Sequence, residues 1–361
     1  MTLILNDDDV ARALSMEKCI EALEEAYKDL ANGTAVSPGR RDCFLAASDS
    51  NAYYSFKCID GGLERLKIYA QRVDSDMISY QTINGTARRV KVPAARQNRY
   101  VGLVYLYSTE NLELLAIMND GHLQRMRVAG TTGVAAKYLA RENARILALL
   151  GSGWQAETAA WALASVRKLT NVRIYSPNPE NRNLLARKLS RSLPCQVTAV
   201  DGADRAIEGA DIVATATNSQ GPVLSGNLIR EGMHLTCITP VEFDEEAWRK
   251  SHRIVVSSFD NDYQSYKTRH PSLIGIRSDQ DKRTIESAYG ERYGKKLVTL
   301  SQLLVGKGRG RQSPEEITLF HKGVGLGIEF ASAGKVVYDQ ARELRLGREI
   351  PTEWFTQSSH P

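Results

Sequence analysis

The sequence of 361 residues predicts an α/β fold with a parallel sheet in its middle and a smaller, strand-rich region at its start. An apolar run over residues 146–150 is followed by a glycine turn and an Ala-rich helical pattern. Further apolar runs alternate with helical or polar segments as far as residue 257. The first 128 residues contain instead one clear helical pattern and several strand-like runs.

The segment over residues 151–156 has the pattern of a dinucleotide-binding turn. The strand-like run ends at Leu150, and a Gly-x-Gly-x-x-Ala sequence then opens a helical pattern. Gly151 permits a sharp turn, Gly153 lets the backbone approach a pyrophosphate, and Ala156 keeps the helix close to its strand. Such a turn also occurs without a nucleotide, but a second strand-like run follows and completes a βαβ unit. We therefore expect the whole turn to bind cofactor: Gly151, Ser152, Gly153, Trp154, Gln155 and Ala156.

Two further loops are expected to face the same cofactor, because ligands of parallel sheets bind at the carboxyl ends of strands. These loops end the strand-like runs that begin at residues 210 and 233. Their expected cofactor-binding residues are Thr215, Ala216, Thr217, Ile238 and Thr239.

The end of the second strand-like run indicates which nicotinamide cofactor is used. Enzymes that use NAD commonly have an acidic residue there, which binds the ribose hydroxyls. This sequence has Ser176 and Asn178 instead, and Arg182 follows where it could meet a 2′-phosphate. We expect NAD(P) with a slight preference for NADP, unless Arg182 only faces solvent on the following helix.

Composition excludes several classes of protein. The formal net charge of +5 is mild, and basic residues are spread along the chain, which argues against nucleic-acid binding. No apolar stretch is long enough to span a membrane, and the first residues lack the basic region of a signal peptide. The 5 cysteines are scattered, which indicates a reducing cytoplasm, and the 6 dispersed histidines give no support for a metal site.

The two ends of the chain differ from its middle. Ser15 precedes a helical pattern whose apolar stripe is Ile20, Leu23, Tyr27 and Leu30. Small residues over 128–139 predict a helix that passes from one domain to the next. Residues 259–311 are long and polar, which predicts an insertion or lid. A last helix is expected over 328–346 and returns to the first region.

Several segments together resemble the ornithine cyclodeaminase/mu-crystallin family of NAD(P)-dependent enzymes. Their order and spacing match over nearly the whole chain. The segments are Val36-Ser37-Pro38-Gly39-Arg40, Leu66-Lys67-Ile68, the run from Ala116 to Gly121 with Arg127 after it, residues 135–140, residues 150–156, residues 209–213, and Phe320-His321-Lys322-Gly323-Val324-Gly325.

The resemblance implies a homodimer and a division into two domains. Residues 1–128 plus 320–361 would form a smaller α+β domain, built from both chain ends, for substrate binding and dimerisation. Residues 129–319 would form a Rossmann-type NAD(P)-binding domain that contains the insertion. Lys322 and Gly323 would add to the cofactor site.

The resemblance also implies that two arginines and one lysine bind the carboxylate of a small amino, imino or 2-oxo acid. The matching positions are Arg40, Lys67 and Arg127, although Arg41 could replace Arg40. A guanidinium binds a carboxylate through two hydrogen bonds, and a lysine can polarise an imine or move a proton. Lys67 is therefore also the expected catalytic residue.

Two departures from the family pattern bear on the reaction. Val128 stands where the family usually has Thr after the second arginine, and Val241 stands where cyclodeaminases have a catalytic Asp. Glu242 is one residue away and would restore an acid if the register slipped by one residue.

We therefore expect hydride transfer at a C–N bond, as in an imine reductase or amino-acid dehydrogenase. One alternative is an ornithine cyclodeaminase-like lyase, with Glu242 as its catalytic acid group. The other is a non-catalytic NAD(P)H-binding protein of the mu-crystallin type.

Overall fold

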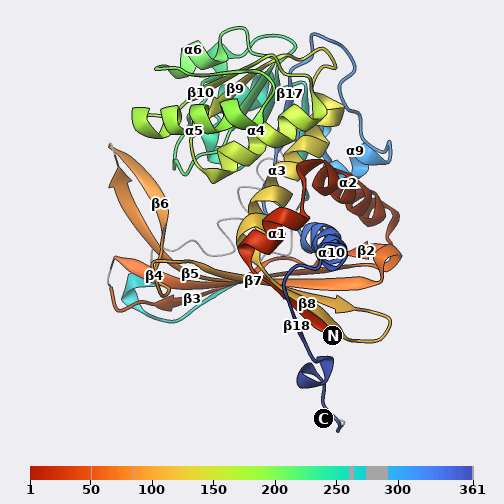
Figure 1. The fold of residues 1–361 in the computed structure, drawn as a ribbon. Helices are drawn as coiled ribbons and strands as arrows, with labels where there is room; N and C mark the ends of the chain where they lie inside the picture. The colour runs from red at the N-terminus through yellow and green to blue at the C-terminus, as the bar shows by residue number, and fades with distance from the viewer. Residues whose placement is uncertain (50, 84, 260–263, 274–291, 360–361) are drawn as a thin grey trace.

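The computed structural model describes residues 1–49, 51–83, 85–259, 264–273 and 292–359. The strands of these residues form two sheets, of 10 and 8 strands. Figure 1 shows the second sheet with its helices above the first sheet, and helices α1, α3 and α10 on the upper face of the first. The expected α/β class with a parallel sheet domain is confirmed.

The first sheet combines the two ends of the chain. Its strands are β1 (Thr2–Leu5), β2 (Ala35–Val36), β3 (Arg41–Ala46), β4 (Ala52–Leu63), β5 (Ile68–Ile83), β6 (Thr86–Val92), β7 (Val101–Ser108), β8 (Leu114–Asn119), β15 (Gln264–Lys267) and β18 (Arg348–Ile350). The strand order is β15-β3-β4-β5-β7-β8-β1-β18, with β2 beside β4 and β6 beside β5. Since β1 pairs with β18, the last strand closes one edge beside the first.

The second sheet is parallel throughout its described pairs. Its strands are β9 (Ile146–Leu150), β10 (Asn171–Tyr175), β11 (Gln196–Ala199), β12 (Ile212–Thr215), β13 (His234–Cys237), β14 (Arg253–Val256), β16 (Leu297–Thr299) and β17 (Thr318–His321). The order β11-β10-β9-β12-β13-β17-β14-β16 places β9 and its glycine turn near the centre. Buried apolar strands of this kind need helices on both faces.

The helices of the described residues are α-helices and short 3₁₀ turns. The α-helices are α1 (Asp7–Ala13), α2 (Met16–Asn32), α3 (Asp120–Leu139), α4 (Trp154–Val166), α5 (Pro179–Ser192), α6 (Ala203–Ile207), α7 (Glu245–Lys250), α9 (Leu300–Leu304) and α10 (Gly327–Glu343). The 3₁₀ turns are η1 (Glu64–Leu66), η2 (Gly226–Leu228), η3 (Pro240–Glu242), η4 (Pro271–Leu273), η5 (Gly294–Lys296) and η6 (Thr352–Phe355).

Helices α2 and α3 join the two halves through small residues. The Ser15 hydroxyl accepts from the N–H of Lys18, so it caps α2 as the sequence predicts. A Cβ at Gly130 would lie 2.7 Å from Leu23, and one at Gly133 would lie 2.8 Å from Ile20. The absence of these side chains lets α2 pack closely against α3, which runs from the first sheet toward the second (Figure 1).

The segment that the sequence treats as an insertion is divided between the sheets. β15 pairs with β3 of the first sheet, whereas β16 pairs with β14 of the second. β17 belongs wholly to the second sheet, so we propose that the change between units falls after His321 rather than at residue 320. The sequence also predicts a helix over residues 283–293, and this prediction lies largely outside the described residues. Within the described part of the chain, no helix combines the length and apolar character needed to cross a membrane.

The start of α10 lies directly on β4. A Cβ at Gly327 would lie 1.7 Å from the carbonyl oxygen of Asp60, and one at Gly61 would lie 2.8 Å from the backbone of Gly327 and Ile328. No side chain fits between these backbones. The position of α10 over the sheet therefore depends on two glycines.

We expect Gly327→Ala to lower the free energy of unfolding by more than about 3 kcal/mol, since backbone would have to move to admit the methyl group. Gly334→Ala on the same helix is the matched control, because its Cβ would have no neighbour closer than 3.8 Å. That control should be neutral or stabilising by up to about 1 kcal/mol, as alanine favours helix. Urea unfolding of both variants measures the difference, and equal stabilities would contradict the close approach.

Candidate active site

The carboxyl ends of the strands in the second sheet meet at one edge. The last residues of four neighbouring strands face one another in the register: Leu150, Thr215, Cys237 and His321. The glycine turn, the loops after β12 and β13, and Lys322 therefore leave the sheet side by side. This edge is where a parallel sheet binds its ligand.

The glycine turn has the shape that a dinucleotide requires. Gly151 has a φ of 130°, and a Cβ there would lie 2.3 Å from the carbonyl oxygen of Ala216. Gly153 caps α4 and faces open space, because a Cβ built there has no heavy atom within 4 Å. Ala156 is buried against the sheet, while Trp154 is exposed. The first free N–H groups of α4 thus meet space that suits a pyrophosphate.

The predicted residues after β10 lie beside this turn. The hydroxyl of Ser152 is 2.8 Å from that of Ser176, and Arg182 donates to the carbonyl oxygen of Ser176 at 2.9 Å. Asn178 caps α5 by accepting from the N–H of Asn181. Arg182 is therefore held at the strand end, where the adenosine ribose lies in such folds.

The surroundings of Glu242 differ from those expected of a catalytic acid. Its buried carboxylate accepts hydrogen bonds from the N–H and hydroxyl of Thr217, at 2.7 and 2.8 Å. It also accepts from the N–H groups of Ile238 and Thr239, at 3.1 and 3.0 Å. Four donors occupy the two oxygens, so the carboxylate holds the loops after β12 and β13 together. Glu242 is placed to shape the cofactor site rather than to abstract a proton.

Lys322 connects the cofactor edge to the first sheet. It follows β17 directly, and its buried ammonium lies 2.9 Å from Glu329 on α10. Arg127 on α3 donates to the other oxygen of Glu329 at 2.6 Å. One carboxylate thus binds the predicted cofactor residue Lys322 and the predicted substrate residue Arg127.

Two hydroxyl groups complete the surroundings of Glu329. Tyr27 of α2 donates to it at 2.6 Å, and Thr131 of α3 at 3.3 Å. Burial acts to raise the pKa of Glu329, but Lys322 and Arg127 hold that pKa below its usual value. Burial and the nearby Glu329 charge raise the pKa of Tyr27 well above 10. Glu329 is therefore ionised and Tyr27 neutral at physiological pH.

The guanidinium of Arg127 is enclosed. Its Nε and Nη2 atoms donate to the side-chain oxygen of Gln124 at 3.1 and 2.7 Å. It lies 4.7 Å above the ring of Phe330, and Arg72 lies 5.7 Å from the same ring. A Cβ at Gly325 would lie only 2.2 Å from this guanidinium, so a larger residue there would have to displace Arg127 from its pair with Glu329.

Arg72 of β5 begins a buried network on the upper face of the first sheet. It donates through Nε and Nη2 to Asp120 at 2.9 and 2.6 Å, and lies 3.0 Å from Asp74. Burial acts to lower the pKa of Arg72, but Asp120 and Asp74 raise it further above its usual value. This arginine is permanently charged.

Lys57 of β4 is the next member of the network. It pairs with Asp76 and lies 3.2 Å from Asp74, its neighbour across the strands. Lys91 of β6 contacts the same two carboxylates from a more exposed position. Burial lowers the pKa of Lys57 to about 8, against the opposing effect of Asp74. Lys57 can therefore change charge near neutral pH.

Arg40 lies at the far end of this network from Arg127. It donates through two nitrogens to Asp42, both at 2.7 Å, and Asp42 faces Lys57 across strands β3 and β4. The structure therefore brings Arg40 and Arg127 to the two ends of one charged surface.

Lys67 lies apart from that surface. It occupies a left-handed turn after η1, with a φ of 54°, and its side chain pairs with Glu110. Its side chain is 60% exposed. The structure does not bring Lys67 to Arg40 and Arg127, because it ends the β4–β5 turn, whereas the network lies within the strands.

Sequence reasoning missed Lys57 and Arg72. Arg72 alternates with two acidic residues in Arg72-Val73-Asp74-Ser75-Asp76, whereas Lys57 has no charged residue at an alternate position of β4. The alternation of charged residues was therefore an available signal for Arg72 but not for Lys57. In contrast, no group of His, Cys, Asp and Glu in the described residues could hold a metal ion.

The hairpin of β5 and β6 connects the first sheet to the cofactor loops. Arg88 donates to the side-chain oxygen of Asn218 at 2.8 Å and forms a backbone bridge with Ser219. Figure 1 shows β6 rising from the first sheet toward the second. The loop after β12 is thus bound by Glu242 through Thr217, and by the β5–β6 hairpin through Asn218.

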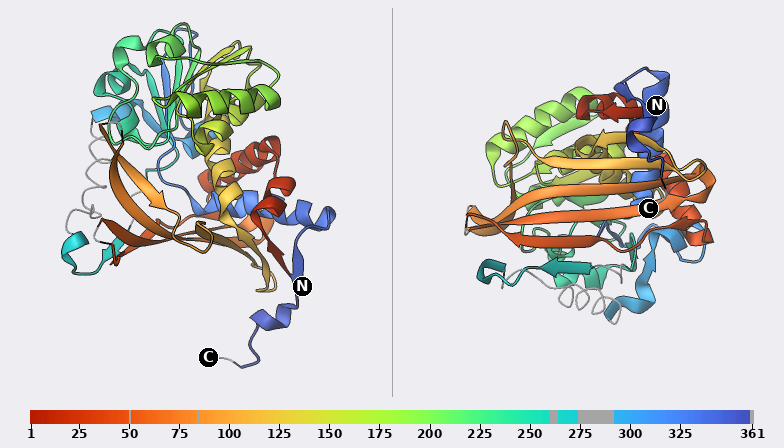
Figure 2. Two further views of the ribbon diagram at one scale, coloured as in Figure 1. Left: turned by 60° about the vertical axis from the view of Figure 1, so that its left-hand side comes forward. Right: turned by 90° about the horizontal axis from the view of Figure 1, so that it is seen from below.

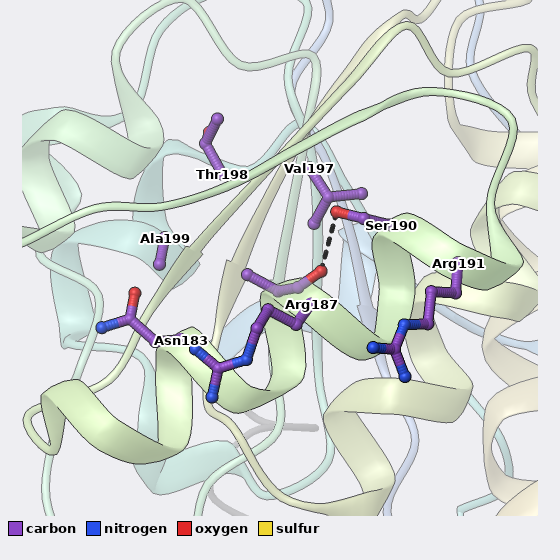
Figure 3. A pocket seen from close by; sticks show the side chains of 8 residues that line it. Asn183, Arg187, Ser190, Arg191, Val197, Thr198 and Ala199 are labelled. Carbon is purple, nitrogen blue, oxygen red and sulfur yellow. Dashed lines mark hydrogen bonds between the residues drawn. The ribbon is translucent and has the colours of Figure 1, made fainter.

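A shallow hollow lies elsewhere, between α5 and β11 at the edge of the second sheet (Figure 3). Its polar lining residues include Asn183, Arg187, Ser190 and Thr198. Figure 3 shows Ser190 bonded to the backbone of its own helix. These residues belong to an outer edge and include none of the predicted site residues.

A dinucleotide-type turn that is connected through Lys322 and Glu329 to a buried network of charged residues is typical of a nucleotide-dependent enzyme. The model of the ornithine cyclodeaminase/mu-crystallin family matches residues 1–345. The chain belongs to this family, and the predicted resemblance is confirmed.

Known proteins similar to the chain have related activities. A Delta(1)-pyrroline-2-carboxylate reductase of Bacillus cereus is 26% identical over 96% of this chain and 99% of its own. An ornithine cyclodeaminase of Agrobacterium fabrum is 32% identical over 74% of this chain and 70% of its own. The Thermococcus litoralis Delta(1)-pyrroline-2-carboxylate reductase, solved with NADH and L-proline, is 29% identical, with a TM-score of 0.77 over 97% of this chain and 100% of its own.

We expect Glu242→Gln to raise the dissociation constant of the reduced cofactor about tenfold, since the amide cannot accept from all four donors and buried unpaired donors cost about 1–3 kcal/mol. Fluorescence titration of the cofactor measures this. Glu246→Gln, on the surface of nearby α7, is the matched control and should leave the constant unchanged. A catalytic base would instead lose kcat with cofactor affinity intact, and that result would contradict the holding role.

Proposed function

We propose that this chain is an NAD(P)H-dependent oxidoreductase that reduces the C=N bond of a small imino acid, or oxidises the corresponding amino acid. The observation that supports it most directly is the shared Glu329, which joins Lys322 at the cofactor edge to Arg127 on the substrate side. The pyrroline-2-carboxylate reductases among its relatives reduce a cyclic imino acid of this class.

In this proposal the cofactor supplies the hydride, and the chain binds and orients both reactants. The residues of the glycine turn bind the pyrophosphate, with Thr215, Ala216, Thr217, Ile238, Thr239 and Gly323 along the same edge. Arg127 attracts the substrate carboxylate, because a guanidinium group binds a carboxylate through paired hydrogen bonds. Arg40 lies at the far end of the network and is already paired with Asp42.

The acid that protonates the substrate nitrogen is, in our proposal, Lys57 rather than Lys67. Lys57 lies in the same network as Arg72 and Asp74, and its pKa of about 8 suits proton transfer near neutral pH. Lys67 is exposed and pairs with Glu110 instead. Asp74 and Asp76 hold the Lys57 ammonium in place.

We expect kcat/KM for imine reduction to fall as pH rises through about 8, since only the protonated Lys57 can donate. Lys57→Met should lower kcat at least about a hundredfold, the usual contribution of an acid catalyst, and should remove this part of the pH profile. Lys67→Met is the matched comparison and should retain both the wild-type kcat and the wild-type pH profile. Steady-state rates are measured with cyclic imino acids as substrates, and separately with 2-oxo acids plus ammonia. Loss of activity in the Lys67 variant alone would restore the sequence-based assignment.

Gln124 occupies the place where a substrate carboxylate would bind Arg127. Its single oxygen accepts from both Nε and Nη2 of Arg127. A carboxylate forms stronger hydrogen bonds with a guanidinium than an amide does. We propose that the substrate displaces this side chain, which is only partly buried.

We expect Gln124→Ala to lower the substrate KM about fivefold with kcat unchanged, because a competing hydrogen bond worth about 1 kcal/mol is removed. Steady-state kinetics with saturating cofactor measure both constants. Gln302→Ala removes an exposed amide that accepts from the N–H of Thr299 at the start of α9, and it is a control for amide removal elsewhere. An increase in KM would show that Gln124 itself contributes to substrate binding.

The choice of cofactor remains part of the proposal. We retain the preference for NADP because no acidic residue stands directly at the end of β10 and Arg182 is held there by Ser176. The Thermococcus relative, however, was solved with NADH. Rates with the two reduced cofactors, compared in wild type and Arg182→Ala, separate these possibilities.

Two other functions make different predictions for the same assay. An ornithine cyclodeaminase, as in the Agrobacterium relative, would release ammonia without net oxidation of the cofactor. The commitment of Glu242 to four donors argues against it as the acid of that reaction. A mu-crystallin-type binding protein would bind reduced cofactor and show no turnover.

We also propose that the chain is a homodimer formed through the lower face of the first sheet. Since Lys57 and Arg72 point to the helices, their strand neighbours point the other way. Figure 2 shows that no helix of the described residues covers this face. Its residues lie in cross-strand rows that include Leu45, Tyr54 and Met77, then Cys58, Val73 and Leu103, then Tyr105 and Ile117. An uncovered sheet face with apolar rows of this kind is typical of a protein interface.

The 5 cysteines are free, which supports a reducing compartment such as the cytoplasm.

A further inference from the structure

The chain after β18 projects from the body of the protein on the side of the open sheet face. β18 is fixed to β1 through the pairs Thr2↔Ile350 and Ile4↔Arg348, so the start of the projecting segment is anchored. Figure 1 shows the C-terminus below the sheet, and the view from below in Figure 2 shows it in front of the strands. We call residues 351–359 the tail.

The tail presents aromatic side chains to solvent. Trp354 is 75% exposed and Phe355 is 42% exposed. They lie in η6, which is closed by a backbone hydrogen bond from Trp354 to Pro351 at 3.1 Å. Residues 353–359 are all exposed. The turn therefore holds two large apolar groups away from the subunit to which they belong.

An ordered pair of exposed aromatic residues is typical of an interface, where tryptophan commonly contributes much of the binding energy. The nearest extended apolar surface on the same side is the open face, with Leu45, Tyr54 and Tyr105 among its residues. A second copy on that face would meet the tail. In a two-fold dimer the same contact occurs twice, once from each tail.

We propose that the tail of each subunit packs against the other subunit, with Trp354 and Phe355 as its contact residues. This inference rests on the proposed homodimer. It adds a second contact, outside the sheet face, that is made by the end of the chain.

The test is the dimer dissociation constant, measured by sedimentation velocity over a dilution series of the full chain. We expect the double variant Trp354→Ala, Phe355→Ala to raise this constant at least about tenfold, as removal of interface aromatic residues does. A chain that ends at Ile350 keeps β18 and should behave in the same way. Leu184→Ala is the control, because Leu184 is 57% exposed on α5, away from the first sheet, and should leave the constant unchanged.

A cross-linking experiment locates the contact independently. A photoreactive group at Thr356 should join two chains of different tags, and the joined peptides should come from the first sheet of the other chain. Cross-links confined to one chain, or an unchanged dissociation constant in the double variant, would overturn the tail contact while leaving the sheet dimer intact. A wild-type chain that is monomeric at every concentration would overturn both the tail contact and the sheet dimer. The proposed imine reduction would be unaffected by that result, because the activity assay does not depend on the oligomeric state.

Discussion

Glu329 on α10 contacts four side chains that come from three other parts of the chain. It accepts hydrogen bonds from Tyr27, Arg127 and Thr131 and forms an ion pair with Lys322. All of this lies out of contact with water, where an ionised carboxylate is stable only if its partners are complete. The carboxylate therefore determines how α2, α3, α10 and the segment after β17 pack together. It also fixes Lys322 and Arg127 relative to each other, so the cofactor edge and the substrate side form one arrangement.

The cofactor edge could be predicted from the sequence because its determinants are local. Gly151 and Gly153 are two residues apart, and the strand, turn and helix around them follow in order. The substrate side could not be predicted to the same extent. Lys57 meets Asp74 only through the antiparallel register of β4 and β5, and the register depends on a hairpin whose length the sequence does not reveal. Lys67 was chosen from its place in a short motif, but it ends the hairpin turn instead.

Glu242 shows how a correctly located residue can have an unexpected role. Its position after β13 follows from the strand pattern, and the sequence correctly predicts that it lies at the carboxyl edge. Two of its donors, however, belong to Thr217, which is 25 residues earlier in the chain. Whether a buried carboxylate acts as a base depends on how many donors already occupy it, and only the folded structure supplies those donors.

The charges of the network indicate what kind of substrate it can accept. On the upper face of the first sheet, four cations, Arg40, Lys57, Arg72 and Lys91, are matched by four carboxylates, Asp42, Asp74, Asp76 and Asp120. Around α10, two cations, Arg127 and Lys322, share the single carboxylate of Glu329. Among these residues one positive charge is therefore in excess, and it lies at the junction with the cofactor edge. A substrate with one carboxylate balances that charge, and a buried site stabilises such a pair more than water does. This excess charge supports the function that we propose, in which a small monocarboxylic imino acid binds with its carboxylate at Arg127.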